Sequence, residues 1–141
     1  MLEEFRKVSH FRVPFADIDM LQHANNTAYL RWAETARSEY LIEVIGADIG
    51  GRTGMILARL DISYERAISY RENIAIGCRV SRLGNKSFDF AHEVWSVDSE
   101  TRCAKIVTTM VAMDYGRETS IAVPAEWRKR IAAYELVGAN A

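Results

Sequence analysis

The sequence predicts an α+β fold in which one long helix comes early and five strands form an antiparallel sheet. Two observations lead to this prediction. Apolar residues between Asn25 and Ile45 recur at intervals of three and four, which is the period of a helix. Four later runs are strand-like, and turn residues separate them. A helix followed by a series of strands is typical of the α+β class.

The first strand and the long helix have recognisable ends. Residues 11–15 alternate between apolar and polar, and Pro14 confines this short strand to an edge or a strand end. The helix spans about five turns. Asn25 is expected as its N-cap and Gly46 as the residue just past its end. Glu34 and Arg37 are expected to form an ion pair within the helix.

The rest of the chain supplies four strands and a short helix. The strands are expected at residues 55–64, 73–80, 88–94 and 104–113. The second should have one buried face, and the last, apolar on both faces, should lie centrally with both faces covered. Pro124 opens a short helix in which Trp127, Ile131 and Tyr134 share a face. No repeat or linker interrupts residues 1–141, so a single domain is expected.

Composition excludes several classes of function. The chain has 141 residues with 18 basic and 19 acidic side chains, so it lacks the basic excess that nucleic acid binding requires. No window of about 18 apolar residues predicts a membrane span, and the charged residues 3–7 argue against a signal peptide. We therefore expect a cytoplasmic protein with no membrane partner. Cys78 and Cys103 are expected in the core, with no metal site; His10 and His92 are expected to be structural.

Polar side chains are concentrated in residues 15–29, between the first strand and the helix. Two carboxylates, an imidazole and two asparagine amides occur within ten residues, namely Asp17, Asp19, His23, Asn25 and Asn26. Unpaired backbone N–H groups at the start of a helix suit a site where negative charge develops. The same residues would also suit a loop whose Asp and Asn side chains cap turns, and the pattern alone leaves both interpretations open.

The string D-I-D-M-L-Q-H-A-N-N-T-A-Y resembles the signature of the 4-hydroxybenzoyl-CoA thioesterase group of hot-dog-fold enzymes, D-x-D-x-x-G-H-x-N-N-x-x-Y. It is also similar to the Q-H-x-N-N stretch of plant acyl-carrier-protein thioesterases. Three further strings fall where the family has them: E-T-A-R (34–37), R-L-G-N-K-S-F (82–88) and V-P-A-E-W-R (123–128). The resemblance implies a hot-dog fold, in which an antiparallel sheet wraps a long helix and subunits pair.

The resemblance also implies a role for each residue of the motif. Asp19 corresponds to the catalytic carboxylate, as nucleophile or general base, and Asp17 to its structural neighbour. The backbone N–H at or near Asn26 would polarise the thioester carbonyl. His23 occupies the position of a histidine that is thought to assist at the thioester.

Two residues are assigned to substrate binding, and two depart from the family pattern. Lys86, in a turn, matches a basic position that holds the phosphates of coenzyme A in some relatives, and Tyr29 is expected to line the pocket. Gln22 stands where many relatives have Gly. Leu21 stands where the plant enzymes have an active-site Asn. The basic residues 128–130 are expected to form a solvated helix face.

The function predicted from the resemblance is hydrolysis of an acyl-CoA to a free acid and coenzyme A, with no cofactor. Acyl carrier protein is an alternative carrier. A non-catalytic acyl-CoA or fatty-acyl binding protein is an alternative function. A hot-dog hydratase or dehydratase is another, but its H-F-P-G-x-P string is missing. Because a sheet that wraps one helix leaves exposed edges, we expect a homodimer or homotetramer, with each active site drawing on both subunits of a dimer.

Overall fold

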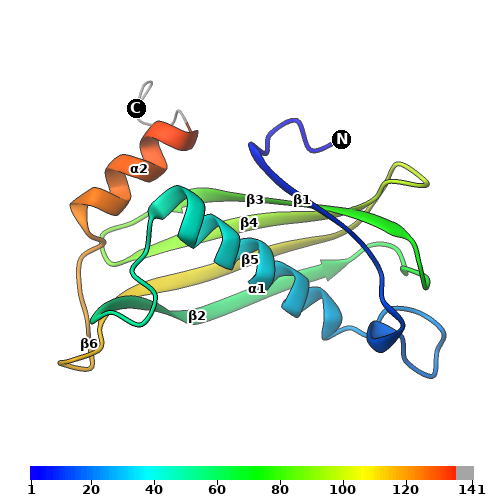
Figure 1. Ribbon diagram of the computed structural model, residues 1–141, viewed down its shortest axis with the longest axis horizontal. Coiled ribbons are helices and arrows are strands. Elements are labelled where there is room, and N and C mark those ends of the chain that lie inside the picture. The colour runs from blue at the N-terminus through cyan, green and yellow to red at the C-terminus, as the bar shows by residue number, and fades with distance from the viewer. Residues whose placement is uncertain (136–141) are drawn as a thin grey trace.

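The computed structural model describes residues 1–135 and contains one curved sheet, one long helix and a shorter C-terminal helix (Figure 1). In chain order the elements are β1 (Lys7–Arg12), the 3₁₀ turn η1 (Phe15–Asp17), α1 (Ala28–Tyr40), the π-helical turn η2 (Leu41–Ile45), β2 (Thr53–Tyr64), β3 (Asn73–Leu83), β4 (Ser87–Ser96), β5 (Thr101–Asp114), β6 (Thr119–Ser120) and α2 (Ala125–Glu135).

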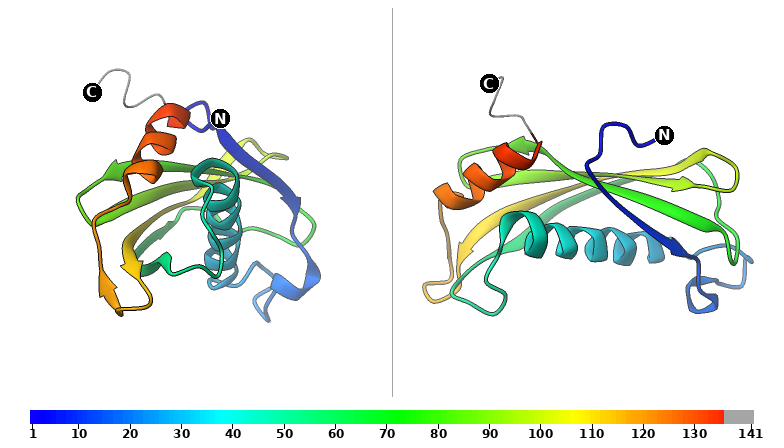
Figure 2. Two further views of the ribbon diagram at one scale, coloured as in Figure 1. Left: turned by 60° about the vertical axis from the view of Figure 1, so that its left-hand side comes forward. Right: turned by 45° about the horizontal axis from the view of Figure 1, so that its top comes forward.

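The strands pair in the order β1-β3-β4-β5-β2, and the short β6 pairs with the end of β5. Every pairing is antiparallel. Figure 2 shows that the sheet curves around α1, which lies against its concave face. This arrangement confirms the predicted α+β class and the hot-dog fold.

The core lies between α1 and the concave face of the sheet. The helix turns a face with two small residues, Ala33 and Ala36, toward the strands, which lets its backbone approach them closely. Tyr40, at the end of α1, packs edge-to-face on Phe90 of β4 with 5.3 Å between ring centroids. Burying side chains of this size stabilises the fold by about 1.5–3 kcal/mol each. The core therefore fixes α1, and with it the loop that precedes α1.

The start of the chain differs from the prediction. The first strand is Lys7–Arg12 rather than residues 11–15, and residues 15–17 form a 3₁₀ turn. Val13 still donates its N–H to the Glu72 carbonyl, but Pro14 has no N–H with which to continue the pairing. Because β1 is a half-buried edge strand, the alternation of its residues is weak.

The helix also starts later than predicted. Its first residue is Ala28 and its N-cap is Thr27, not Asn25. Asn25 lies two residues before the N-cap. Its side-chain oxygen accepts hydrogen bonds from the Thr27 N–H (2.9 Å) and the Thr27 hydroxyl (2.6 Å). The far end agrees with the prediction, since Gly46 caps η2 in the left-handed conformation with φ 68°.

Two expectations for the faces of the sheet are wrong. β5 is an interior strand between β4 and β2, as expected, but its outer face is not covered, since Lys105 and Val107 are exposed. β3 is covered on both faces over part of its length, since Phe5 packs on Gly77. A Cβ at Gly77 would lie 2.4 Å from Phe5 Cγ, so this contact requires glycine.

Three predictions for individual side chains can be compared with the structure. No ion pair joins Glu34 to Arg37 in the described residues; Arg37 is instead buried, and burial lowers the pKa of its guanidinium. Cys78 and Cys103 are free, buried thiols, as predicted. Arg128 is not simply solvated, because it donates to the Gly84 and Asn85 carbonyls and so ties α2 to the β3–β4 turn.

No helix within residues 1–135 is long and apolar enough to cross a membrane.

Candidate functional site

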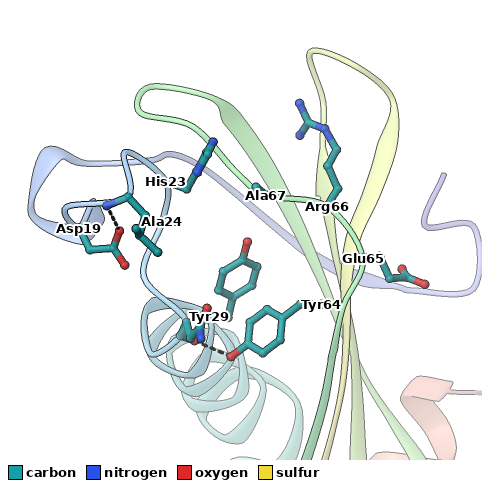
Figure 3. Close-up of a pocket in the computed structure, with 10 residues that line it drawn as sticks. Asp19, His23, Ala24, Tyr29, Tyr64, Glu65, Arg66 and Ala67 are labelled. Carbon is teal, nitrogen blue, oxygen red and sulfur yellow. Dashed lines mark hydrogen bonds between the residues drawn. The ribbon is translucent and has the colours of Figure 1, made fainter.

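A pocket opens where the loop before α1 faces the end of β2. It has a volume of about 340 Å³, within the range typical of small-molecule sites. Figure 3 shows Asp19 and His23 on one side of the pocket and Tyr64 and Arg66 on the other. Its lining residues are Asp19, Leu21, His23, Ala24, Asn26, Tyr29, Tyr64, Glu65, Arg66 and Ala67. The structure thus brings together four of the five predicted site residues.

A tight turn in residues 18–24 presents Asp19. Ile18 and Ala24 pair across the turn, and the Asp19 N–H donates to the His23 carbonyl at 3.1 Å. Gln22 adopts φ 67°, a left-handed conformation that glycine enters without strain. The turn geometry therefore suits Gly, the residue that the family signature has at this position.

Two donors hold the half-buried Asp19 carboxylate. One oxygen accepts the Leu21 N–H at 2.8 Å, and the other accepts the Asn25 side-chain amide at 3.0 Å. The oxygen of the same Asn25 side chain accepts a hydrogen bond from the Thr27 N–H at the start of α1. A single side chain therefore links the carboxylate to the helix N-terminus, a bridge that the sequence interpretation missed when it assigned Asn25 as a simple cap.

The carboxylate of Asp17 has different hydrogen-bond partners from that of Asp19. It is buried, and its two oxygens accept hydrogen bonds from Arg31 (2.5 Å) and the Trp32 indole (2.8 Å), both on α1. Its carbonyl accepts the Asn25 N–H at 2.8 Å. Asp17 is not among the residues that line the pocket, and its side chain ties the loop to the helix, which agrees with the role of structural neighbour.

Asn26 lines the pocket and leaves one backbone donor unpaired in the described part of the chain. Its N–H has no acceptor among the groups of residues 1–135. The first N–H groups of a helix lack partners within the helix and carry partial positive charge, and Asn26 lies just before them. The site therefore has a free donor that could stabilise a developing oxyanion.

His23 and Tyr29 complete the polar lining. His23 is exposed at the mouth of the pocket, and its ring makes no hydrogen bond in the part of the chain that the structure describes. Tyr29 is buried in α1, and burial raises the pKa of its hydroxyl to about 12. The Tyr29 hydroxyl therefore stays protonated at neutral pH, where it can donate or accept a hydrogen bond.

Tyr64 and Arg66 are among the lining residues that were not predicted to belong to a site. Tyr64, at the end of β2, donates its hydroxyl to the Asn26 carbonyl at 2.7 Å. Arg66 follows β2 and pairs with Glu72 at 2.9 Å, and this hydrogen bond raises the pKa of Arg66 further above its ordinary value. Neither residue lies in a recognisable motif, and only the chain fold brings them to the loop.

Lys86 does not line this pocket. It is exposed in the turn between β3 and β4, to which Arg128 of α2 donates, whereas the loop that lines the pocket lies at the opposite end of α1 (Figure 1). A helix of 13 residues is about 20 Å long. Within a single chain Lys86 is therefore too distant to touch a group held by Asp19.

The sequence matches the model of the thioesterase-like superfamily over residues 13–131. No curated protein has a significantly similar sequence.

Several solved structures resemble this one closely. The PA5185 protein from Pseudomonas aeruginosa is 28% identical with a TM-score of 0.85, and the match covers 94% of this chain and 93% of that chain. A thioesterase from Thermus thermophilus, complexed with coenzyme A and Zn, is 29% identical with a TM-score of 0.84, covering 94% and 96% of the two chains. A 1,4-dihydroxy-2-naphthoyl-CoA thioesterase from Synechocystis, only 15% identical, shares the fold with a TM-score of 0.78 over 89% and 94%.

Proposed function

The chain belongs to the thioesterase-like superfamily, and we propose that it hydrolyses an acyl-coenzyme A at the Asp19 pocket. Membership of the family makes it a thioester hydrolase. The structural relative from Thermus thermophilus that holds coenzyme A supports this carrier. One observation supports the location most strongly: a fixed carboxylate and an unpaired backbone N–H line the same pocket.

In the proposed reaction the thioester carbonyl lies between Asp19 and Asn26. The Asn26 N–H donates to the carbonyl oxygen and stabilises the negative charge that develops there. Asp19 either attacks the carbonyl carbon or removes a proton from an attacking water. His23, at the pocket mouth, would assist at the thioester sulfur or its neighbouring groups. Coenzyme A leaves as the thiol, and the acid follows.

Thiol release from a panel of acyl-CoAs tests this function. Aryl, short-chain and long-chain thioesters should each be assayed, with the same acyl groups on acyl carrier protein as the alternative carrier. Hydrolysis of at least one member supports the proposal. Tight binding of acyl-CoA without release of thiol from any member would identify the chain as an acyl-binding protein instead.

We further propose that subunits pair along β2. This strand ends the sheet order, and no strand within residues 1–135 pairs with its outer edge. Ile56 and Leu57 on this strand are 45% and 46% exposed. A long edge strand with exposed apolar residues is a template for pairing with another chain. Because the pocket lies at the Tyr64 end of β2, a second subunit would also wall the pocket.

Leu57→Lys is expected to weaken this pairing at least ten-fold, because charge on an edge strand opposes pairing. Sedimentation velocity should show a dimer or tetramer for the unmodified protein and a monomer fraction for the variant at low micromolar concentration. Ile42→Lys, which places the same charge on an exposed residue outside the sheet, is the control. A monomeric unmodified protein would contradict the proposed interface.

The same pairing would give Lys86 a role. Two β2 strands related by a two-fold axis run antiparallel, so the Thr53 end of one subunit lies beside the Tyr64 end of the other. Lys86 is at the Thr53 end, since Ser87 pairs with Val111 and Val111 with Ile56. We propose that Lys86 of one subunit contacts the phosphates of coenzyme A bound at the pocket of the other.

Lys86→Ala is therefore expected to raise KM a few-fold and leave kcat nearly unchanged. Exposed charge contacts contribute only about 0.2–1 kcal/mol each, which sets the size of the effect. Arg6→Ala, which removes an exposed cation before β1, should leave both constants unaltered. Steady-state kinetics with one acyl-CoA measures the change, and an unaltered KM in Lys86→Ala removes this residue from the phosphate site.

A further inference from the structure

We propose that Tyr64 is a positioning residue: it holds the Asn26 carbonyl and so fixes the backbone torsions of Asn26, which keeps the Asn26 N–H, in the preceding peptide group, facing the thioester oxygen. The inference rests on the proposed function, because it concerns the oxyanion donor of that reaction. Tyr64 belongs to β2 and Asn26 to the loop before α1, and 38 positions separate them in the sequence. Their contact is therefore a product of the fold rather than of the motif.

The Asn26 carbonyl is excluded from the helix. At the start of α1 the Ala28 N–H donates to the Asn25 carbonyl, and the Leu30 and Arg31 N–H groups donate to the Thr27 carbonyl. The Asn26 carbonyl therefore accepts none of these bonds. In the described residues the Tyr64 hydroxyl is the partner of this carbonyl, at 2.7 Å. Partial burial raises the pKa of Tyr64, so the hydroxyl keeps its proton and acts as the donor at neutral pH.

The position of the Tyr64 ring is itself fixed by packing. Its ring meets Tyr29 edge-to-face at 5.0 Å between centroids, and Tyr29 contacts Trp32 at 4.9 Å. The Trp32 indole donates to Asp17 at the base of the loop. These three aromatic rings therefore connect the end of β2 to α1 and to the loop before α1. Figure 3 shows Tyr64 and Tyr29 side by side below the pocket.

Loss of the Tyr64 hydrogen bond would affect the two peptide groups that flank the Cα of Asn26. Without the hydroxyl, the carbonyl of Asn26 has no protein donor and is free to turn toward the pocket. A carbonyl there would place a partial negative charge where the developing oxyanion needs a donor. Removing the hydroxyl should therefore slow the chemical step and leave substrate binding nearly intact.

Tyr64→Phe tests the proposal because it keeps the ring and removes only the hydroxyl. We expect kcat to fall about five-fold with KM within two-fold, the size expected for one hydrogen bond. Tyr40→Phe is the matched control, because it also removes one hydroxyl donor, to Glu135 at 2.6 Å, at the far end of α1. This control should lower the melting temperature without lowering kcat.

Amide hydrogen exchange supplies a readout that does not depend on activity. The Thr27 N–H shares a peptide group with the Asn26 carbonyl and donates to the Asn25 side chain, so its exchange should accelerate in Tyr64→Phe and stay unaltered in Tyr40→Phe. Unaltered exchange together with an unaltered kcat would overturn the positioning role, while Asp19 could still be required for hydrolysis. If no acyl-CoA is hydrolysed, the proposed function fails, and the exchange measurement still decides whether Tyr64 holds the Asn26 carbonyl.

Discussion

Asp19→Asn is expected to lower kcat at least about 100-fold while the fold stays intact. The amide keeps the size of the side chain and one acceptor oxygen, so the hydrogen bond from the Leu21 N–H can persist. It removes the negative charge that both proposed routes require, whether the carboxylate attacks the thioester or acts as a base toward water. Steady-state kinetics and a melting curve measure the two expectations together.

Asp17→Asn is the matched control, since it makes the same chemical change two residues away. Asp17 accepts hydrogen bonds from Arg31 and Trp32 rather than lining the pocket. We expect this variant to lose about 1–2 kcal/mol of unfolding free energy and to keep most of its kcat. An inactive Asp17→Asn beside an active Asp19→Asn would mean that the two carboxylates have been assigned the wrong way round.

The route can be resolved by single turnover in ¹⁸O-labelled water. If Asp19 attacks the carbonyl, an acyl anhydride forms, and water that attacks its aspartyl carbonyl releases the acid with an unlabelled oxygen from Asp19. If Asp19 acts as a base, water supplies the new oxygen directly and the first acid carries label. The anhydride route alone can therefore give unlabelled acid in the first turnover.

Local patterns in the sequence predicted the elements whose burial is regular. β4 alternates strictly between buried and partly exposed residues, and its predicted alternation from Phe88 to Val94 is observed. The period of α1 was equally clear because one face packs on the sheet. The motif from Asp17 to Tyr29 also folds into one compact loop, so its members reach the pocket together.

The errors occur where structure depends on distant parts of the chain. β5 is apolar on both faces, yet one face stays partly exposed, because α1 covers only the concave face of the sheet. Phe5 covers the outer face of β3 at Gly77 although more than 70 positions separate the two residues. Tyr64 and Arg66 reach the site for the same reason. Lys86 lies at the far end of α1 from the pocket, so the phosphate contact proposed for it is one made across a subunit interface.

A second large effect is expected from His92, which lies in the core of the sheet. It is 1% exposed, and neither ring nitrogen has a well-formed hydrogen bond within residues 1–135. Cys78 and Ile106 flank it on the neighbouring strands, and the Arg37 charge acts on it from α1. Burial and, to a smaller extent, the Arg37 charge together lower the pKa of His92 to about 3, and the Gly77 backbone opposes the shift.

This shift makes the protein less stable in mild acid. An unfolded histidine has a pKa of about 6.5, so above that pH both states are neutral at His92 and stability is complete. As the pH falls from 6.5 toward 3, the unfolded chain binds a proton that the folded chain excludes, and stability is lost. At pH 5 the loss is about 2 kcal/mol relative to pH 8.

His92→Leu should remove that loss, because leucine fills a similar volume and does not titrate. Denaturant unfolding at pH 8 and pH 5 measures it: the difference between the two pH values should shrink by about 2 kcal/mol in the variant. The variant should also be at least as stable at pH 8, since it removes buried nitrogens that lack good partners. His10→Gln, at an exposed position on β1, should keep the pH dependence of the unmodified protein. Equal acid sensitivity in His92→Leu and the unmodified protein would show that the buried imidazole does not cause the loss of stability. The cause would then lie in carboxylates such as Asp89, whose pKa is lowered by the hydrogen bond from Arg82.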